Sequence, residues 1–166
     1  MRRGFTLIEV VIAVAIVAGS VVVVLSLLPS LVQQSSDSTG LLVAQRLPDP
    51  IEERLRRESI AIGFAALATA IPVMAAPLDE GWSMVGTSDG MKLARPGTGS
   101  DAIEEEEQHF LVEIWRFPDP PLSYEAVAVS LPLYLRVSWP YRVPGVSVPT
   151  RLAVRNQFTF CATLKR

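Results

Sequence analysis

Only one cysteine, Cys161, occurs among the 166 residues, which excludes a disulfide bond within the chain. The sequence also has a single histidine, His109, with no second His or Cys at metal-ligand spacing. It contains neither a nucleophile–base pattern nor a glycine-rich phosphate loop. We therefore expect no catalytic residues, no cofactor site and no metal site, and predict that the chain is not an enzyme.

Charge is scarce and unevenly placed. The net charge of −2 and pI of about 5.4 make nucleic acid an unlikely partner. Almost all charged side chains between Asp101 and Glu125 are acidic. Residues 126–166, in contrast, contain no acidic and six basic side chains. The two segments either neutralise each other within one domain or favour head-to-tail contact between copies. The C-terminal arginines also leave a DNA-uptake subunit as a minor alternative.

The longest gap in charge lies near the N-terminus, where no ionisable side chain occurs between Val10 and Ser36. A helix from Phe5 to Leu28 would be roughly 36 Å long, enough to cross a hydrocarbon layer of about 30 Å. Its side chains are apolar on every side, so this segment spans a membrane or is buried in a helical filament. Arg2 and Arg3 place the N-terminus in the cytoplasm by the positive-inside rule.

Glu9 is the exception within this apolar segment. An ionised carboxylate inside a membrane helix costs about 2.5–3.5 kcal/mol on insertion scales. Either Glu9 lies near enough to the interface to be wetted, or it has a cationic partner. If the chain is cut after Gly4, the new amine of Phe5 lies one helical turn from Glu9, within a subunit or between subunits.

The N-terminal sequence closely resembles a known processing signal. The run Arg2-Arg3-Gly4-Phe5-Thr6-Leu7-Ile8-Glu9 is similar to the class III signal of type IV pilins and of type II secretion pseudopilins. The resemblance implies that a prepilin peptidase cuts after Gly4 and methylates the amine of Phe5. It also implies that Glu9 promotes docking of a new subunit. An ordinary secretory signal would instead end in a small-residue site, and the sequence near Leu28 is a poor one.

The resemblance predicts a structural subunit of a type IV pilus or a type II secretion pseudopilus, a minor subunit more than a major one. Its partners would be the prepilin peptidase, other pilin or pseudopilin subunits, and inner-membrane lipid. The protein would be single-pass, with its C-terminal domain in the periplasm and possible incorporation into a filament. The alternative is a membrane-anchored periplasmic binding or adaptor protein that does not polymerise.

Four segments are expected: a leader at 1–4, a transmembrane or filament-core helix at 5–28, a helical continuation and second helix at 29–76, and a β-sheet region at 77–166. Pro29 should end or kink the first helix, which should kink or fray near Ser35 to Gly40. Asp49 is the expected N-cap of the second helix, with Pro50 at its first position and Glu52 completing a capping box. Glu53 and Arg57 should form a supportive pair.

Two later segments leave alternatives open. Ile60 to Ala76 is apolar and is typical either of a buried helix or of a second, short membrane span. The acidic run Glu104 to Glu107 is typical of a solvated loop or helix start. It lacks the ligand spacing of a calcium loop, so no calcium site is expected there.

The remaining sequence alternates as β-strands do. Trp82–Gly86 and Met91–Ala94 flank Ser88-Asp89-Gly90, a hairpin pattern. Further strands are expected at Phe110–Phe117, Val127–Trp139 and Leu152–Leu164. Pro132 should mark an edge or a bulge, and Cys161 should lie on the more polar face. The predicted fold is α+β: a long N-terminal transmembrane helix followed by a small domain with an antiparallel β-sheet packed on helix.

Overall fold

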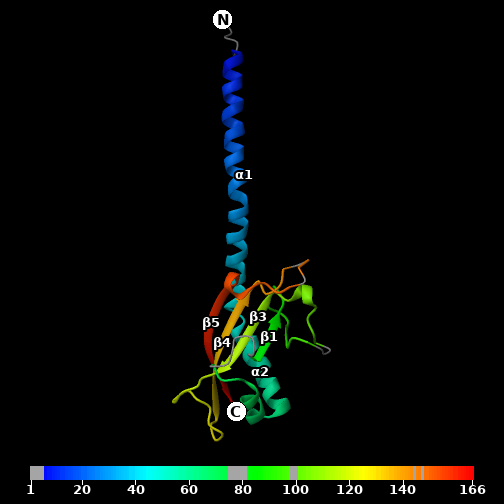
Figure 1. Ribbon diagram of the computed structural model, residues 1–166, viewed down its shortest axis with the longest axis vertical. Helices are drawn as coiled ribbons and strands as arrows, with labels where there is room; N and C mark the ends of the chain where they lie inside the picture. Colours follow the sequence, from blue (N-terminus) through cyan, green and yellow to red (C-terminus); the bar gives the residue numbers. More distant parts are fainter. Residues whose placement is uncertain (1–5, 75–81, 98–100, 144, 147) are drawn as a thin grey trace. The chain divides into compact units, whose positions relative to one another are not determined.

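The computed structural model describes residues 6–74, 82–97, 101–143, 145–146 and 148–166. The chain forms two compact units, Met1–Thr39 and Gly40–Arg166. The first consists of a long apolar helix, and the second contains a five-stranded antiparallel sheet with helices packed on it (Figure 1). The α+β fold expected from the sequence is confirmed. The expected leader at 1–4 lies outside the described residues.

Helix α1 spans Leu7–Ala44 and is longer than expected. It continues through Pro29 and through the segment 35–40, so the helix neither ends at Pro29 nor frays near Ser35 to Gly40. A kink at either place, the other alternative, stays a prediction. The hydroxyl groups of Ser38 and Thr39 donate to the carbonyls of Gln34 and Ser35 at 2.8 and 2.9 Å. These weak helix formers therefore satisfy their side chains on the helix itself. Among the described residues, α1 is the one helix long and apolar enough to cross a membrane.

Helix α2 spans Pro48–Ile62 and begins two residues earlier than expected. Its N-cap is Leu47 and not Asp49, and no side chain caps it. Pro48 takes the first helical position, where its missing N–H costs nothing, and Leu47 is held by burial, with 1% of its surface exposed. The predicted Glu53–Arg57 ion pair is confirmed at 3.0 Å.

The apolar segment Ile60 to Ala76 forms neither a single helix nor a second membrane span in its described part. Helix α2 stops at Gly63, whose φ is 91°, and the short helix α3 covers Phe64–Ala70. Phe64, Leu67 and Ala68 are buried. The segment is therefore a core element of the domain, as the first of the two alternatives predicted.

The sheet has the strand order β2-β1-β3-β4-β5, with antiparallel neighbours throughout. The strands are β1 (Trp82–Gly86), β2 (Leu93–Ala94), β3 (Phe110–Arg116), β4 (Ser130–Trp139) and β5 (Asn156–Lys165). The β1–β2 hairpin is confirmed, with Gly90 at a φ of 71° in its turn. Short 3₁₀ helices cover Glu105–Glu107 and Leu152–Val154.

Two predicted strands begin later than expected. Val127 and Val129 are exposed and precede β4, and Leu152 to Val154 form a 3₁₀ turn before β5. The guanidinium group of Arg155 donates through Nε to the carbonyl of Thr150 at 2.7 Å and also through Nη2. This bond closes the turn, so the alternating pattern becomes strand at Asn156.

Pro132 lies at a local edge, as predicted. Arg166 N–H donates to the carbonyl of Val129, which lies opposite it, at 2.9 Å. Because bonded pairs alternate along an antiparallel ladder, the backbone groups of Pro132 face the β3 side of β4. The pairing with β3 stops at Leu133. The missing N–H of Pro132 therefore falls where β3 has already ended.

The main core fills the space between the sheet and the helices. The apolar residues of β3 and β4 pack with those of α2 and α3, and the most deeply buried are Ile51, Leu55, Leu67, Ile71, Ile114, Leu131, Leu133 and Leu135. Trp139 at the end of β4 lies against Gly40 of α1, within the same unit. This core explains why the apolar side of each strand pattern was readable from the sequence.

The opposite, more polar face of the sheet is partly covered, which the alternating strand patterns did not predict. Val85, Ala94 and Ile103 form a second small cluster there, with Leu111 and Tyr141 beside it. Glu113 and Arg136 form a buried ion pair on this face, with Nε of Arg136 at 3.0 Å from Oε2 of Glu113. Cys161 is exposed on the uncovered part, as expected.

The two oppositely charged segments pair within the domain. Arg136 bonds Glu113, and Arg142 bonds Glu105 at 2.9 Å. Each pair joins the basic C-terminal segment to the acidic one. For these four residues, the interpretation of internal neutralisation is confirmed.

Candidate functional site

The start of α1 carries a reciprocal hydrogen-bonded cap. The backbone N–H and the hydroxyl of Thr6 both donate to Oε2 of Glu9, each at 2.8 Å. The N–H of Glu9 in turn approaches Thr6 Oγ1 at 3.4 Å and Thr6 O at 3.1 Å. This is a capping box, in which an N-cap Thr and a Glu three residues later satisfy each other's backbone donors.

The cap gives Glu9 a partner that does not depend on cleavage. A carboxylate in the first turn also lies at the positive end of the helix dipole. The expected partner, the amine of Phe5, lies outside the described residues, as does Gly4. The described geometry thus tests neither the role of Phe5 nor the cut after Gly4, and both stay predictions.

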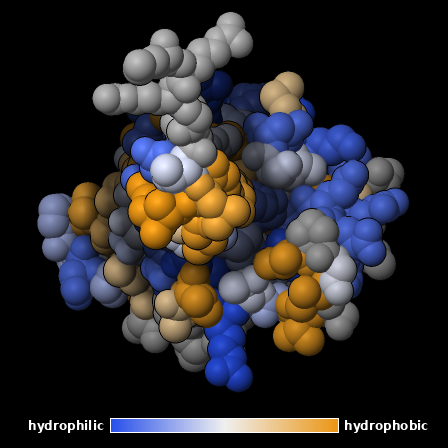
Figure 2. Space-filling view, turned by 90° about the horizontal axis from the view of Figure 1, so that it is seen from above, coloured by the Kyte–Doolittle hydropathy of each residue, from blue (hydrophilic) through white to orange (hydrophobic). Residues whose placement is uncertain are grey.

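The helix that follows presents apolar side chains on every side. From Leu7 to Val32 its large apolar residues are between 47% and 84% exposed. Figure 2, seen from the N-terminal end, shows these side chains as an orange cluster. The segment therefore offers a continuous apolar surface for lipid or for other helices.

The polar groups within this surface are satisfied internally. The hydroxyls of Ser20, Ser26 and Ser30 donate to the carbonyls of Val17, Val23 and Leu27 at 2.7–2.8 Å. Such bonds remove the need for water, which a lipid interior does not supply. Both the composition of the helix and the internal bonding of these three hydroxyls are therefore suited to apolar surroundings.

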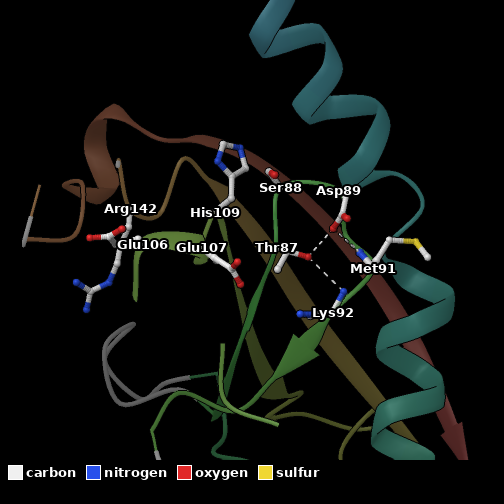
Figure 3. Close-up of a pocket in the computed structure, with 9 residues that line it drawn as sticks. All are labelled: Thr87, Ser88, Asp89, Met91, Lys92, Glu106, Glu107, His109 and Arg142. Atoms are coloured by element: carbon white, nitrogen blue, oxygen red, sulfur yellow. Dashed lines mark hydrogen bonds between the residues drawn. The ribbon is translucent and has the colours of Figure 1, made fainter. Parts of the chain in front are cut away.

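A second candidate site is an open pocket beside the β1–β2 turn, with a volume of about 410 Å³. Figure 3 shows its lining side chains, which carry both signs of charge: Thr87, Ser88, Asp89, Met91, Lys92, Glu106, Glu107, His109 and Arg142. Asp89 accepts from the Thr87 hydroxyl at 2.5 Å and from Met91 N–H at 3.0 Å. These bonds hold the hairpin turn together.

Two groups in this pocket have shifted pKa values. The hydrogen bond from Thr87, followed by that from Met91 N–H, lowers the pKa of Asp89. Burial lowers the pKa of His109, whose ring packs edge-on against Phe110. Asp89 is thus an ionised acceptor already used by its own turn, and His109 is a neutral, packed ring. No group of three His, Cys, Asp or Glu side chains in the described part of the chain could hold a metal ion.

The comparisons with known proteins point to the first site. Residues 1–18 match the family model described as the prokaryotic N-terminal methylation motif. No curated protein and no solved structure matches the chain. The motif is the class III signal, so the resemblance drawn from residues 2–9 is confirmed. The matched segment ends at residue 18, within the first half of α1.

Sequence reasoning missed one feature of this site. The spacing Thr6-x-x-Glu9 before an apolar run is itself the pattern of a capping box. From the sequence we instead expected a cationic partner for Glu9, because an ionised carboxylate is costly in lipid.

Proposed function

We propose, from the class III signal of type IV pilins and pseudopilins carried by residues 1–18, that this chain is a structural subunit of a type IV pilus or a type II secretion pseudopilus. A prepilin peptidase cuts it after Gly4 and methylates Phe5. The apolar helix then stays on the mature protein and serves as anchor and assembly element. The motif itself is the observation that carries the proposal, and it points to a structural role, not an enzymatic one.

The described structure gives two supports for this role, and the sequence gives a third. The helix is apolar on all sides and satisfies its own hydroxyls, as a lipid-embedded or filament-embedded helix must. The domain from Gly40 onward has its own core. Arg2 and Arg3 favour a cytoplasmic N-terminus and a periplasmic domain.

Within the machine we propose a minor subunit in preference to a major one. The absence of any intrachain disulfide and the small strand-rich domain support this choice. The rival function is a membrane-anchored periplasmic adaptor that never polymerises. Co-purification with sheared filaments separates the two, because an adaptor would remain in the membrane fraction.

Processing is tested directly by mass spectrometry of the membrane-extracted chain. We expect a mature N-terminus at Phe5 carrying one methyl group on its amine. Gly4→Leu should leave the precursor uncut, because a branched side chain obstructs the peptidase next to the cut bond. Gly19→Leu, placed deep in the helix, is the matched control and should be processed normally. A mature start near Ser30 would show ordinary secretion instead.

A further inference from the structure

Strand β5 forms the long outer edge of the sheet (Figure 1). Its ten residues pair with β4 on one side, without interruption from Asn156 to Lys165. The bond between Arg166 N–H and Val129 O fixes which residues face β4. Because bonded pairs alternate, the outward N–H and C=O groups belong to the odd-numbered residues: Gln157, Thr159, Cys161, Thr163 and Lys165.

The two edges of the sheet differ in how they are protected from further strand pairing. At the other edge, β2 has two residues, and its Ala94 is packed beside Ile103 of the following segment. Short strands and covering segments are how proteins protect an edge from further pairing. Strand β5 is ten residues long, and it contains no proline, no bulge and no charge before Lys165. Among the described residues, no strand pairs with its outer side.

The charged side chains of β5 and of the residues directly beside it in the sequence are all basic. Lys165 and Arg166 lie at the C-terminal end of β5, and Arg155, whose guanidinium bonds the Thr150 carbonyl and Ser138 Oγ, precedes the strand. A second copy of β5 in antiparallel pairing would bring its Lys165 and Arg166 beside Arg155 of the first. The like charges disfavour such a pair. A strand carrying acidic side chains at its ends complements the edge.

We infer that the outer edge of β5 binds an extended acidic segment of another protein as a sixth strand of the sheet. Main-chain hydrogen bonds from the odd-numbered residues hold the segment, as in other cases of strand addition. Acidic side chains at one end of the segment lie beside Lys165 and Arg166. Acidic side chains at the other end lie beside Arg155, which keeps its bonds to Thr150 and Ser138. Phe158 and Phe160, half-buried with ring centroids 5.7 Å apart, provide apolar surface on the helix side. This binding does not require filament assembly.

The test uses the full chain in detergent and two capped synthetic peptides. The acidic probe is Glu-Val-Thr-Val-Thr-Val-Thr-Val-Glu, and the control probe replaces both Glu residues by Lys. We expect the acidic probe to bind roughly tenfold more tightly, a difference of about 1.4 kcal/mol, since replacing Glu by Lys turns two weak exposed attractions into repulsions. Hydrogen exchange should slow at the amides of Thr159, Cys161 and Thr163.

Variants then separate the edge from other surfaces. Thr159→Pro removes an outward N–H without removing a bond to β4. It should lower the affinity for the acidic probe at least tenfold. The control Thr159→Ala should change this affinity less than twofold. Independently of any folding defect from proline, K165E with R166E should reverse the preference between the two probes. Unchanged preference in that double variant, or slowed exchange confined to another element, overturns the proposal. So does crosslinking of Cys161 between copies that competes with the probe, because the occupant is then a second copy.

Discussion

Glu9 is the residue on which assembly should depend most. In the described chain its carboxylate is held by Thr6, so the charge already has a partner before any subunit joins. Under the proposed function, in which the carboxylate acts in docking between subunits, Glu9→Ala should insert and be cut after Gly4, yet enter sheared filaments poorly. Glu9→Gln should be intermediate or nearly as poor.

Quantitative blotting of membrane and filament fractions measures the effect of Glu9. Normal incorporation of Glu9→Ala would contradict the docking role, provided that the subunit is shown to lie away from the filament tip. A tip subunit has no predecessor to dock against.

Gly40 is required by a close approach. A Cβ at this position would lie 2.2 Å from Nε1 and 2.6 Å from Cδ1 of Trp139, whose side chain is 3% exposed. Gly40→Ala should destabilise the domain by about 1–3 kcal/mol, the usual cost of overpacking. That cost outweighs the gain of up to about 1 kcal/mol that alanine brings to a helix.

Gly19→Ala is the matched control for Gly40, because nothing lies within 4 Å of a Cβ at residue 19. It should leave the melting temperature of the domain unchanged. Calorimetry of both variants measures the difference, and equal melting temperatures would show that Trp139 moves aside without cost.

His109 should make stability fall with acid. Its pKa is lowered in the folded domain by burial, so the unfolded chain binds the proton more readily. The free energy of unfolding should therefore decrease as pH falls through the unfolded value of about 6.5. Urea titrations at several pH values should show a steeper decrease for the natural chain than for His109→Gln. Equal slopes would show that His109 does not carry the pH dependence.

At the scale of elements, periodicity predicted what lies inside a strand or helix better than where it ends. The missing charges predicted the existence of α1, and alternation predicted β3 and β4. The end of α1 depends instead on a turn at Leu47 that distant core residues bury. The start of β5 depends on Arg155 bonding Thr150. Such contacts have no local pattern.

The second face of the sheet shows the same limit. Arg136 and Ser138 occupy polar positions in the alternating pattern, and both are buried. Arg155 reaches Ser138 Oγ through Nη1 at 3.3 Å, and Tyr141 lies beneath the Arg155 guanidinium at 4.9 Å from its ring centroid. Segments distant in sequence cover this face, whereas alternation reports only on neighbours within a strand. The capping box at Thr6 and Glu9, by contrast, could have been predicted from its spacing alone, although it was missed.

At the scale of the molecule, the described core residues all belong to the second unit. The larger cluster begins at Ala44 and the smaller at Val85, and both lie within Gly40–Arg166. Residues 40–166 should therefore fold without the anchor, be soluble without detergent, and unfold in one cooperative transition. Circular dichroism and sedimentation measure these properties.

A shorter fragment starting at Pro48 is the control for that prediction, because it removes the part of α1 that packs on Trp139. Ala44 and Leu47 are 0% and 1% exposed, and losing their buried apolar surface should lower the melting temperature of the shorter fragment relative to the 40–166 fragment. If both fragments aggregate until detergent is added, the domain depends on the anchor for its stability. If they instead associate through β5, Thr159→Lys should restore the monomer, since a charge on an edge strand opposes pairing.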